Sequence, residues 1–176
     1  MPVTSCFQLT LAIIKPHVVK NPIATQKIRE LIIASNFKIV KFKRKLISLP
    51  EAEKFYDEHK RKFFYNRLIT FMTSGPSDMM ILTKENAVKD WRDLMGPTKV
   101  FKAQFEAPDS IRGKYGLSDT RNATHGSDSV DSARREIGIL FPEFNIDEWY
   151  LKEEQLFRLN KLSFYEDKFI HVPIDR

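Results

Sequence analysis

The sequence is poor in the features that mark several large classes of protein. Its only cysteine, Cys6, cannot form an intramolecular disulfide and leaves no cysteine-based metal site, which fits a reducing compartment. No uninterrupted apolar run approaches the roughly 20 residues that span a bilayer, so we expect no membrane span. Residues 1–9 contain neither the basic nor the apolar part of a secretory signal, and no arginine typical of a cleaved mitochondrial leader. We therefore expect an intracellular protein.

The familiar nucleotide and metal motifs are also missing. There is no GxxxxGKS or GxxxxGKT phosphate loop, no GxGxxG turn and no HExxH pair, and the four histidines lack metal-ligand spacing. These absences exclude the P-loop and dinucleotide modes of nucleotide binding. Any anion site in this chain must therefore be built from side chains.

What is present is a globular composition with a basic surplus. The 176 residues are 42% hydrophobic and 30% charged, which suits one compact domain and excludes wholesale disorder. Lysine and arginine number 29 against 23 acidic residues, which leaves a net charge of +6. Such a surplus favours anionic partners such as nucleotides, nucleic acid or acidic membranes, but it also keeps an ordinary small domain soluble. No dedicated nucleic-acid motif accompanies it.

Hydrophobic periodicity predicts an alternation of strands and helices. Short apolar runs predict strands over residues 7–14, 37–47 and 79–82. Capping residues and apolar stripes predict helices from Pro22, from Leu49, over 64–72, over 85–95 and over 130–141. The last of these helices has Asp128 or Ser129 as its cap. This order predicts an α+β sandwich with one mostly antiparallel sheet.

Two segments show little periodicity. Residues 97–127 hold three of the six glycines and a cluster of cations, and a loop of this length in a compact domain is usually functional or disordered. Residues 151–176 carry mixed charge and a weak pattern, and we interpret them as a peripheral tail. The chain is therefore divided into a domain over residues 1–150 and a tail over residues 151–176.

The strongest candidate for chemistry is His125, which precedes the helix predicted over residues 130–141. A neutral imidazole is a good nucleophile or acid–base group near physiological pH. Gly126 would let a substrate approach closely, and Glu136 on the helix could hold one ring nitrogen and fix the tautomer. The plainer interpretation is that residues 127–129 only cap a helix and that His125 takes no part in chemistry.

Other candidates are individually ambiguous. Lys15 directly follows a predicted strand, where a charge is often presented to a ligand. Arg92, Arg112 and Arg121 could form a phosphate clamp, because guanidinium groups match phosphate oxygens bidentately. Phe64 fits a core stripe by spacing, yet an aromatic ring at a helix start can also stack on a base. Taken singly, each of these residues has an ordinary surface or core explanation.

Together these residues form a pattern that resembles one known family. The matching blocks are Ile14-Lys15-Pro16, Phe63-Phe64, Ser74-Gly75-Pro76, Leu94-Met95-Gly96-Pro97-Thr98, Ser110-Ile111-Arg112-Gly113 and Arg121-Asn122 followed by His125-Gly126-Ser127-Asp128-Ser129. In order and spacing over residues 9–150 they resemble the nucleoside diphosphate kinase family. The Asn-x-x-His-Gly-Ser-Asp block is the most specific of them.

The resemblance implies a fold and a reaction. The expected fold is a ferredoxin-like α/β sandwich, in which a four-stranded antiparallel sheet is covered by helices. The expected reaction is reversible transfer of the γ-phosphate from a nucleoside triphosphate to a nucleoside diphosphate, with His125 as the phosphohistidine nucleophile. By the same resemblance Ser127 and Glu136 orient this imidazole, and Tyr56 lies near the catalytic pair. One nucleophile among several cations suits phosphoryl transfer, in which positioning and charge stabilisation dominate.

The resemblance also assigns the substrate contacts. Mg²⁺ would arrive on the nucleotide phosphates rather than in a protein cage, so no protein metal site is expected. The matching positions are Lys15 and Asn122 for the sugar hydroxyls, Arg92, Thr98 and Arg112 for the phosphates, and Phe64 with Leu68 beside it for the base.

The sequence departs from the family pattern at two places. The usual Lys-Pro-Asp is Lys15-Pro16-His17, and the segment between Thr98 and Arg112 is longer than in typical members. In the family that segment helps to form the nucleotide cleft and subunit contacts, so we expect an oligomer smaller than a hexamer, or a monomer. The alternative function is a weakly active or inactive homologue that acts as an interaction partner in a larger assembly. Divergent members are associated with mitochondria, so the expected compartment is mitochondrial or cytoplasmic.

Overall fold

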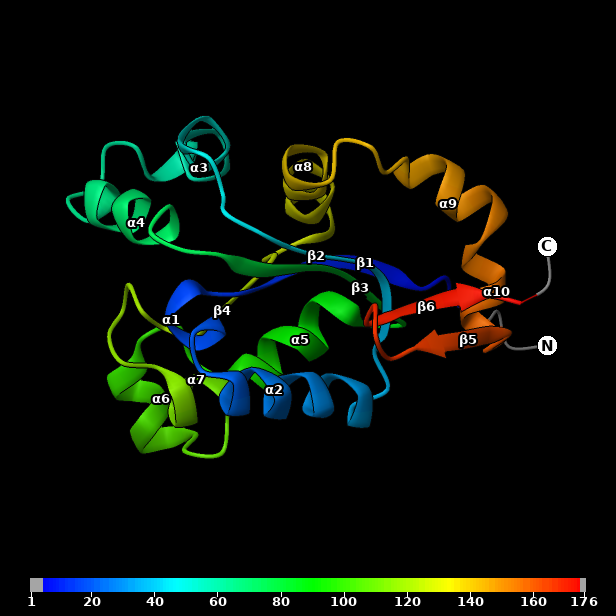
Figure 1. The fold of residues 1–176 in the computed structure, drawn as a ribbon, viewed down its shortest axis with the longest axis horizontal. Helices are drawn as coiled ribbons and strands as arrows, with labels where there is room; N and C mark the ends of the chain where they lie inside the picture. Colours follow the sequence, from blue (N-terminus) through cyan, green and yellow to red (C-terminus); the bar gives the residue numbers. More distant parts are fainter. Residues whose placement is uncertain (1–4, 175–176) are drawn as a thin grey trace.

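A four-stranded antiparallel sheet forms the centre of the molecule, with helices on both of its faces (Figure 1). The computed structural model describes residues 5–174; residues 1–4, where the expected domain begins, and 175–176, where the expected tail ends, lie outside the described residues. The sheet has the order β2-β3-β1-β4. Its strands are β1 (Gln8–Ile14), β2 (Lys38–Lys45), β3 (Ser77–Lys84) and β4 (Thr124–Gly126). The expected ferredoxin-like sandwich is confirmed.

Strand β1 lies in the middle of the sheet and separates two hydrophobic cores. Leu11 and Ile13 pack into one core, while Ala12 and Ile14 pack into the other. A pleated strand that is buried on both faces produces this alternation. β1 also carries the ladder to β4, in which Ile13 pairs with His125. The most buried strand therefore fixes the backbone of the candidate nucleophile.

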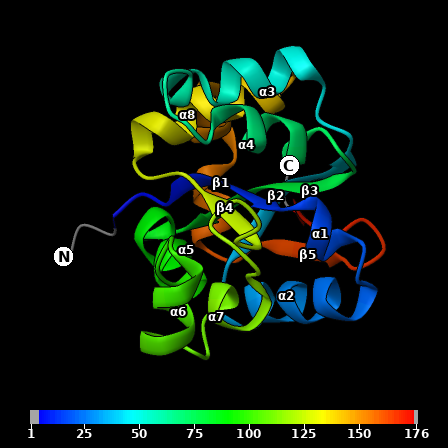
Figure 2. The same cartoon turned by 90° about the vertical axis from the view of Figure 1, so that its left-hand side faces the viewer.

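Helices form a layer on each side of the sheet (Figures 1 and 2). One layer contains α3 (Leu49–Phe55), the 3₁₀ turn η1 (Asp57–His59), α4 (Tyr65–Met72), α8 (Val130–Leu140) and α9 (Ile146–Lys152). The other contains α1 (Pro16–Val19), α2 (Pro22–Ala34), α5 (Ala87–Met95), α6 (Val100–Glu106) and α7 (Ile111–Tyr115). No helix within residues 5–174 is both long enough and apolar enough to cross a membrane.

Side-chain caps begin the helices where the sequence predicted them. The Asn21 side chain accepts hydrogen bonds from two backbone N–H groups at the start of α2. Ser48 and Glu51 form the predicted capping box of α3. At α8 the Ser129 hydroxyl accepts from the backbone N–H of Ser132, so Ser129 rather than Asp128 is the cap. Such caps satisfy backbone donors that a first helical turn leaves unpaired.

The segment from residue 97 to residue 127 is not the irregular loop that its weak periodicity predicted. It contains α6, α7 and β4. These helices have seven and five residues, about two turns or fewer, so neither repeats its apolar positions often enough to form a readable stripe. The readable signal was Ser110, whose hydroxyl accepts from the backbone N–H of Gly113 and caps α7.

The segment after residue 150 differs from the expected peripheral tail because it is folded against both cores. It forms α10 (Glu154–Arg158) and a hairpin of β5 (Leu162–Tyr165) and β6 (Ile170–Pro173). Phe157 packs on Trp149, and Phe169 is buried with its ring edge-on to Phe42. The backbone N–H of Ile39 donates to Nδ1 of His171 at 2.9 Å. Since β2 is an edge strand, the hairpin covers part of an edge that would otherwise be open to another strand.

Candidate active site

A cleft of about 530 Å³ is lined by residues of α4 and of the segment that joins α7 to β4. These elements lie at the end of the molecule away from the β5–β6 hairpin (Figure 1). One wall comes from η1 and α4, and the other from the start of α6 and the segment that joins α7 to β4. Eight of the expected site residues line it: Lys15, Tyr56, Phe64, Leu68, Thr98, Arg112, Asn122 and His125. The fold therefore brings together residues that lie more than a hundred positions apart in the sequence.

His125 is held in the cleft by a buried carboxylate. Its Nε2 lies 2.5 Å from Oε1 of Glu136 on α8, and the Glu136 side chain is only 4% exposed. The ring of Phe55 packs edge-on against the imidazole, with the centroids 4.9 Å apart. A carboxylate only accepts, so the bond places a proton on Nε2 and leaves the lone pair of Nδ1 for a ligand. The expected interaction of Glu136 with one ring nitrogen is present.

The backbone around His125 is constrained on both sides. Ala123 is fully buried with a φ of 76°, in the left-handed region that an alanine rarely adopts. Its carbonyl accepts from the backbone N–H of Lys15 at 2.9 Å, which ties the end of β1 to this strained turn. A Cβ on Gly126 would come within 2.4 Å of the Trp91 indole. Gly126 is therefore needed for the approach of Trp91, and not for the approach of a substrate as the sequence suggested.

Two buried cations lie in the cleft without a carboxylate partner. Lys15 is 5% exposed and Arg112 is 8% exposed, and among the described residues neither forms an ion pair. Lys15 donates to the carbonyl of Thr120, while Arg112 donates to those of Gly96 and Thr124. Buried cations without counter-ions are costly in an empty protein and favour the binding of an anion.

The electrostatics of these cations follow from that burial. Burial, and next to it the charge of Arg112, lowers the pKa of Lys15 from 10.5 to about 7. Burial, followed by the charge of Arg92, lowers the pKa of Arg112 to about 10. In both cases the protein disfavours the charged form more than water does. A bound phosphate would remove much of this penalty.

Within residues 5–174, several polar atoms beside the cleft also lack a protein partner. Asn122 is buried and donates from Nδ2 to the carbonyl of Thr98 at 3.3 Å, but its Oδ1 accepts nothing. The hydroxyl of Tyr56 and Oε2 of Glu136 are likewise buried without a partner. Burial, and then the charge of Glu136, raises the pKa of Tyr56. Buried polar groups are normally satisfied, so these atoms mark a site that a ligand or ordered water completes.

The rim of the cleft contains residues that sequence reasoning did not single out. Phe64 is half-buried at the start of α4, with the 90% exposed Phe63 edge-on to it at 5.5 Å. The His59 ring lies 5.5 Å from that of Phe64. The other unrecognised lining residues are Arg67, Lys99, Asp119, Thr120 and Thr124. They lie within a few positions of the recognised motifs, but only the fold turns them toward a common space.

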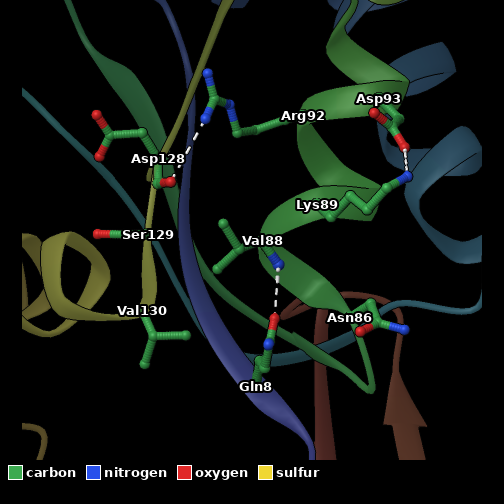
Figure 3. A pocket seen from close by; sticks show the side chains of 9 residues that line it. All are labelled: Gln8, Asn86, Val88, Lys89, Arg92, Asp93, Asp128, Ser129 and Val130. Carbon is green, nitrogen blue, oxygen red and sulfur yellow. Dashed lines mark hydrogen bonds and ion pairs between the residues drawn. The ribbon is translucent and has the colours of Figure 1, made fainter.

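Ser127 and Arg92 lie outside this cleft. The fully buried Ser127 hydroxyl accepts from the backbone N–H of Leu11 at 3.1 Å and so joins β1 to the end of β4. Arg92 lines a neighbouring pocket between α5 and the start of α8, where it donates to the carbonyl of Asp128 at 3.4 Å (Figure 3). Arg92 nevertheless acts on the cleft at a distance, because its charge contributes to the lowered pKa of Arg112.

Arg121, expected in the phosphate clamp, and His17, which departs from the family pattern, both lie outside the lining of the cleft. The guanidinium of Arg121 lies over the ring of Phe71, 5.6 Å from its centroid, and Arg121 does not line the cleft with the other cations. His17 packs against the same ring and donates from Nε2 to the carbonyl of Tyr115 at 3.4 Å. Burial lowers the pKa of His17. The departure at this position therefore brings no extra charge into the cleft.

Within residues 5–174 no group of three or more histidine, cysteine or acidic side chains is arranged to hold a metal ion. In the cleft itself Asp119 carries the single carboxylate among the lining residues that the structure describes. The donor set is therefore cationic and hydrogen-bonding, which suits an anionic ligand rather than a bare cation.

Comparison with known proteins agrees with this geometry. The family model for nucleoside diphosphate kinase matches residues 8–146. Relatives named nucleoside diphosphate kinase 6 are 47% identical in Danio rerio, over 98% of both chains, and 46% identical in Homo sapiens, over 93% of this chain and 88% of that one. These alignments extend into the folded segment after residue 150.

Solved structures give the same answer for the fold. The Aquifex aeolicus nucleoside diphosphate kinase superimposes with a TM-score of 0.74 at 35% identity, covering 81% of this chain and 98% of that one. The Halobacterium salinarum enzyme, solved in complex with CDP, superimposes with a TM-score of 0.71 at 34% identity, over 80% and 90% of the two chains. The residues that carried the sequence resemblance, the sheet order and these alignments agree, and the chain belongs to the nucleoside diphosphate kinase family.

Proposed function

We propose that this protein transfers the γ-phosphate of a nucleoside triphosphate to a nucleoside diphosphate through a phosphohistidine on His125. The observation that carries the proposal is the imidazole whose Nε2 is held by Glu136, in a cleft with two buried cations that have no counter-ion among residues 5–174. Family membership and the CDP complex of the Halobacterium salinarum relative support a nucleotide as the ligand.

The first half-reaction forms the phosphoenzyme. The lone pair on Nδ1 of His125 attacks the γ-phosphorus, the new N–P bond forms, and the bond from phosphorus to the β,γ-bridging oxygen breaks. The leaving diphosphate takes that oxygen with its electron pair. Glu136 keeps the proton on Nε2 and stabilises the positive charge that develops on the ring. Lys15 and Arg112 stabilise the negative charge on the phosphates, which is the main contribution that a protein makes to this reaction.

The second half-reaction reverses the first with another diphosphate. A terminal oxygen of its β-phosphate attacks the phosphorus on Nδ1, and the N–P bond breaks, returning the electron pair to the ring. A covalent intermediate lets one cleft serve donor and acceptor in turn, so no second nucleotide site is required. No general base is needed either, because both the ring nitrogen and the phosphate oxygen attack without losing a proton.

The cleft also gives the substrate a direction. We assign the phosphates to Arg112 and Lys15 beside His125, the sugar hydroxyls to Lys15 and Asn122, and the base to Phe64 at the rim; all of these residues line the cleft. Mg²⁺ enters with the nucleotide as part of the substrate, held by phosphate oxygens, because this ion keeps most of its ligands from water and phosphate. The protein then contributes cations and hydrogen bonds around that complex.

The proposal is tested by labelling with γ-³²P-ATP and Mg²⁺. We expect phosphate on His125 that is acid-labile and alkali-stable, and we expect its transfer to added diphosphate. His125→Ala should abolish both, whereas His17→Gln removes a histidine outside the cleft and should leave both intact. A label that mass spectrometry places elsewhere, or labelling that survives His125→Ala, would overturn the mechanism. Nucleotide binding without any label would instead favour an inactive homologue.

A further inference from the structure

We propose that Asp119 reads the base of the nucleotide and makes the cleft prefer bases that present amino or imino hydrogens, guanine above all. The proposal rests on the proposed function, because it assumes that the cleft binds a nucleotide. It concerns the base of the nucleotide. Stacking on Phe64 cannot distinguish one base from another, since every base has a face on which an aromatic ring can stack.

Asp119 has a fixed place at the rim of the cleft. It lies in the segment that joins α7 to β4, and its Oδ1 accepts a hydrogen bond from the backbone N–H of Val100 at 3.2 Å. This bond holds the carboxylate against the start of α6; no donor to Oδ2 is found within residues 5–174, so this oxygen can accept from a ligand. The residue is exposed and lines the same cleft as Phe64 and Leu68.

Charge indicates which part of a nucleotide Asp119 faces. Four cationic side chains line the cleft, namely Lys15, Arg67, Lys99 and Arg112, whereas Asp119 carries the single negative charge among the lining residues within 5–174. Phosphates are drawn to the buried pair of cations and are repelled by a carboxylate. Asp119 therefore faces the uncharged part of the ligand. Because Phe64 and Leu68 form the apolar wall, the edge of a base stacked there is what the carboxylate can reach.

The chemistry of a carboxylate ranks the bases. An ionised aspartate only accepts hydrogen bonds. Guanine offers N1–H and N2–H side by side, while adenine and cytosine each offer a single amino group. Uracil offers one N–H between two carbonyl oxygens, which the carboxylate repels. The expected order of affinity is therefore guanine first, adenine and cytosine next, and uracil last.

The expected preference is modest because the carboxylate is exposed. A hydrogen bond to a charged group at such a site changes affinity by about tenfold. A preference of this size leaves the enzyme able to use every common diphosphate. It is still large enough to measure by equilibrium binding.

Dissociation constants measured by calorimetry with the full chain test the proposal. The ligands are GDP, IDP, which lacks the N2 amino group, ADP and UDP, each with Mg²⁺. We expect GDP to bind about tenfold more tightly than UDP, with IDP between them. Asp119→Asn keeps one oxygen for Val100 but replaces the other with an amide N–H that donates, so its preference should move toward UDP. Asp109→Asn changes an exposed aspartate outside the cleft and should leave the order unchanged.

The outcomes separate this proposal from the one on which it rests. Equal affinities for GDP and UDP, or a preference that survives Asp119→Asn, would overturn the role of Asp119 while phosphate transfer on His125 stands. Weaker binding of GDP by Asp119→Asn, together with unchanged or tighter binding of UDP, would support it. If no diphosphate binds at millimolar concentration, both proposals fail.

Discussion

Lys15 should take up a proton when a nucleotide binds. In the free protein, burial and the neighbouring Arg112 lower the pKa of Lys15 to about 7. An anionic phosphate chain in the cleft opposes the effects of burial and of Arg112 on this pKa. Its negative charge is a counter-charge for Lys15 and offsets the positive charge of Arg112. The pKa of Lys15 then rises toward its ordinary value. Above pH 7 binding and protonation are therefore linked.

The number of protons taken up on binding follows from the pKa of about 7 for Lys15 in the free protein. At pH 8 about one-tenth of the free protein carries a charged Lys15, so full protonation in the complex takes up about 0.9 proton per nucleotide. Over the same range the dissociation constant should rise almost tenfold per pH unit, up to the pKa in the complex. Protons released or taken up by the terminal phosphate change this uptake little at pH 8, because the second pKa of a phosphate is about 6.

Calorimetry in two buffers of different ionisation enthalpy measures this uptake directly. Lys15→Gln removes the titrating group and should abolish the uptake, whereas Lys20→Gln removes an exposed lysine outside the cleft and should not. The unfolded chain keeps the ordinary pKa of 10.5 and binds more protons between pH 7 and 10.5, so the contribution of Lys15 to the free energy of unfolding should rise with pH across that window. Binding at pH 8 with no proton uptake would refute this account of the cleft.

Three further outcomes are expected. Arg112→Ala should lower kcat by an amount equal to roughly 2–4 kcal/mol of transition-state stabilisation. Arg134→Ala breaks only an exposed ion pair and should lower kcat little. Equally small losses for the two variants would show that Arg112 is not part of the site. Light scattering at low micromolar concentration should find an assembly smaller than a hexamer, and a stable hexamer would mean that the longer 98–112 segment lies outside the interfaces. Because Lys15 and Asn122 are assigned to the sugar, a 3′-deoxy diphosphate should lose more kcat/KM than any change of base, and the bases themselves should differ by no more than about a hundredfold. A larger spread among bases in the same assay would contradict this.

The parts of the fold that were predictable are those whose signals are local and repeated. Strand β1 has seven residues and was predicted to within one residue of both ends, and helix α2 has thirteen residues and was predicted from its first residue. By contrast α6, α7 and the C-terminal hairpin have four to seven residues each, too few for a period to emerge from the sequence. They are held by tertiary contacts instead, such as the hydrogen bond from the backbone N–H of Ile39 to the His171 ring. No local sequence pattern predicts such a contact.

The candidate site divides in the same way. His125 and Glu136 could be paired in advance because His125 precedes one predicted helix and Glu136 lies on it, and the 2.5 Å contact agrees with that prediction. Arg121 was misplaced because a cation near a motif has many directions open to it, and here it lies on Phe71. Asp119 was missed because a lone acidic residue in a weakly patterned segment gives no sequence signal, and only the fold brings it into the cleft that Phe64 also lines.

The contrast between two sets of buried charges explains why the cleft is a site at all. Asp78 is fully buried, and it is paired with Arg29 at 3.0 Å and with Arg44 at 2.6 Å, so its charge is balanced within the protein. Lys15 and Arg112 are buried almost as deeply but pair only with backbone carbonyls. The charge of Asp78 is balanced, but the two cations in the cleft are not. Their burial and mutual repulsion raise the electrostatic free energy of the protein when the cleft is empty. A bound polyphosphate supplies the missing negative charge and lowers this electrostatic free energy, which favours binding. The same two cations then stabilise the charge on the phosphates during phosphoryl transfer.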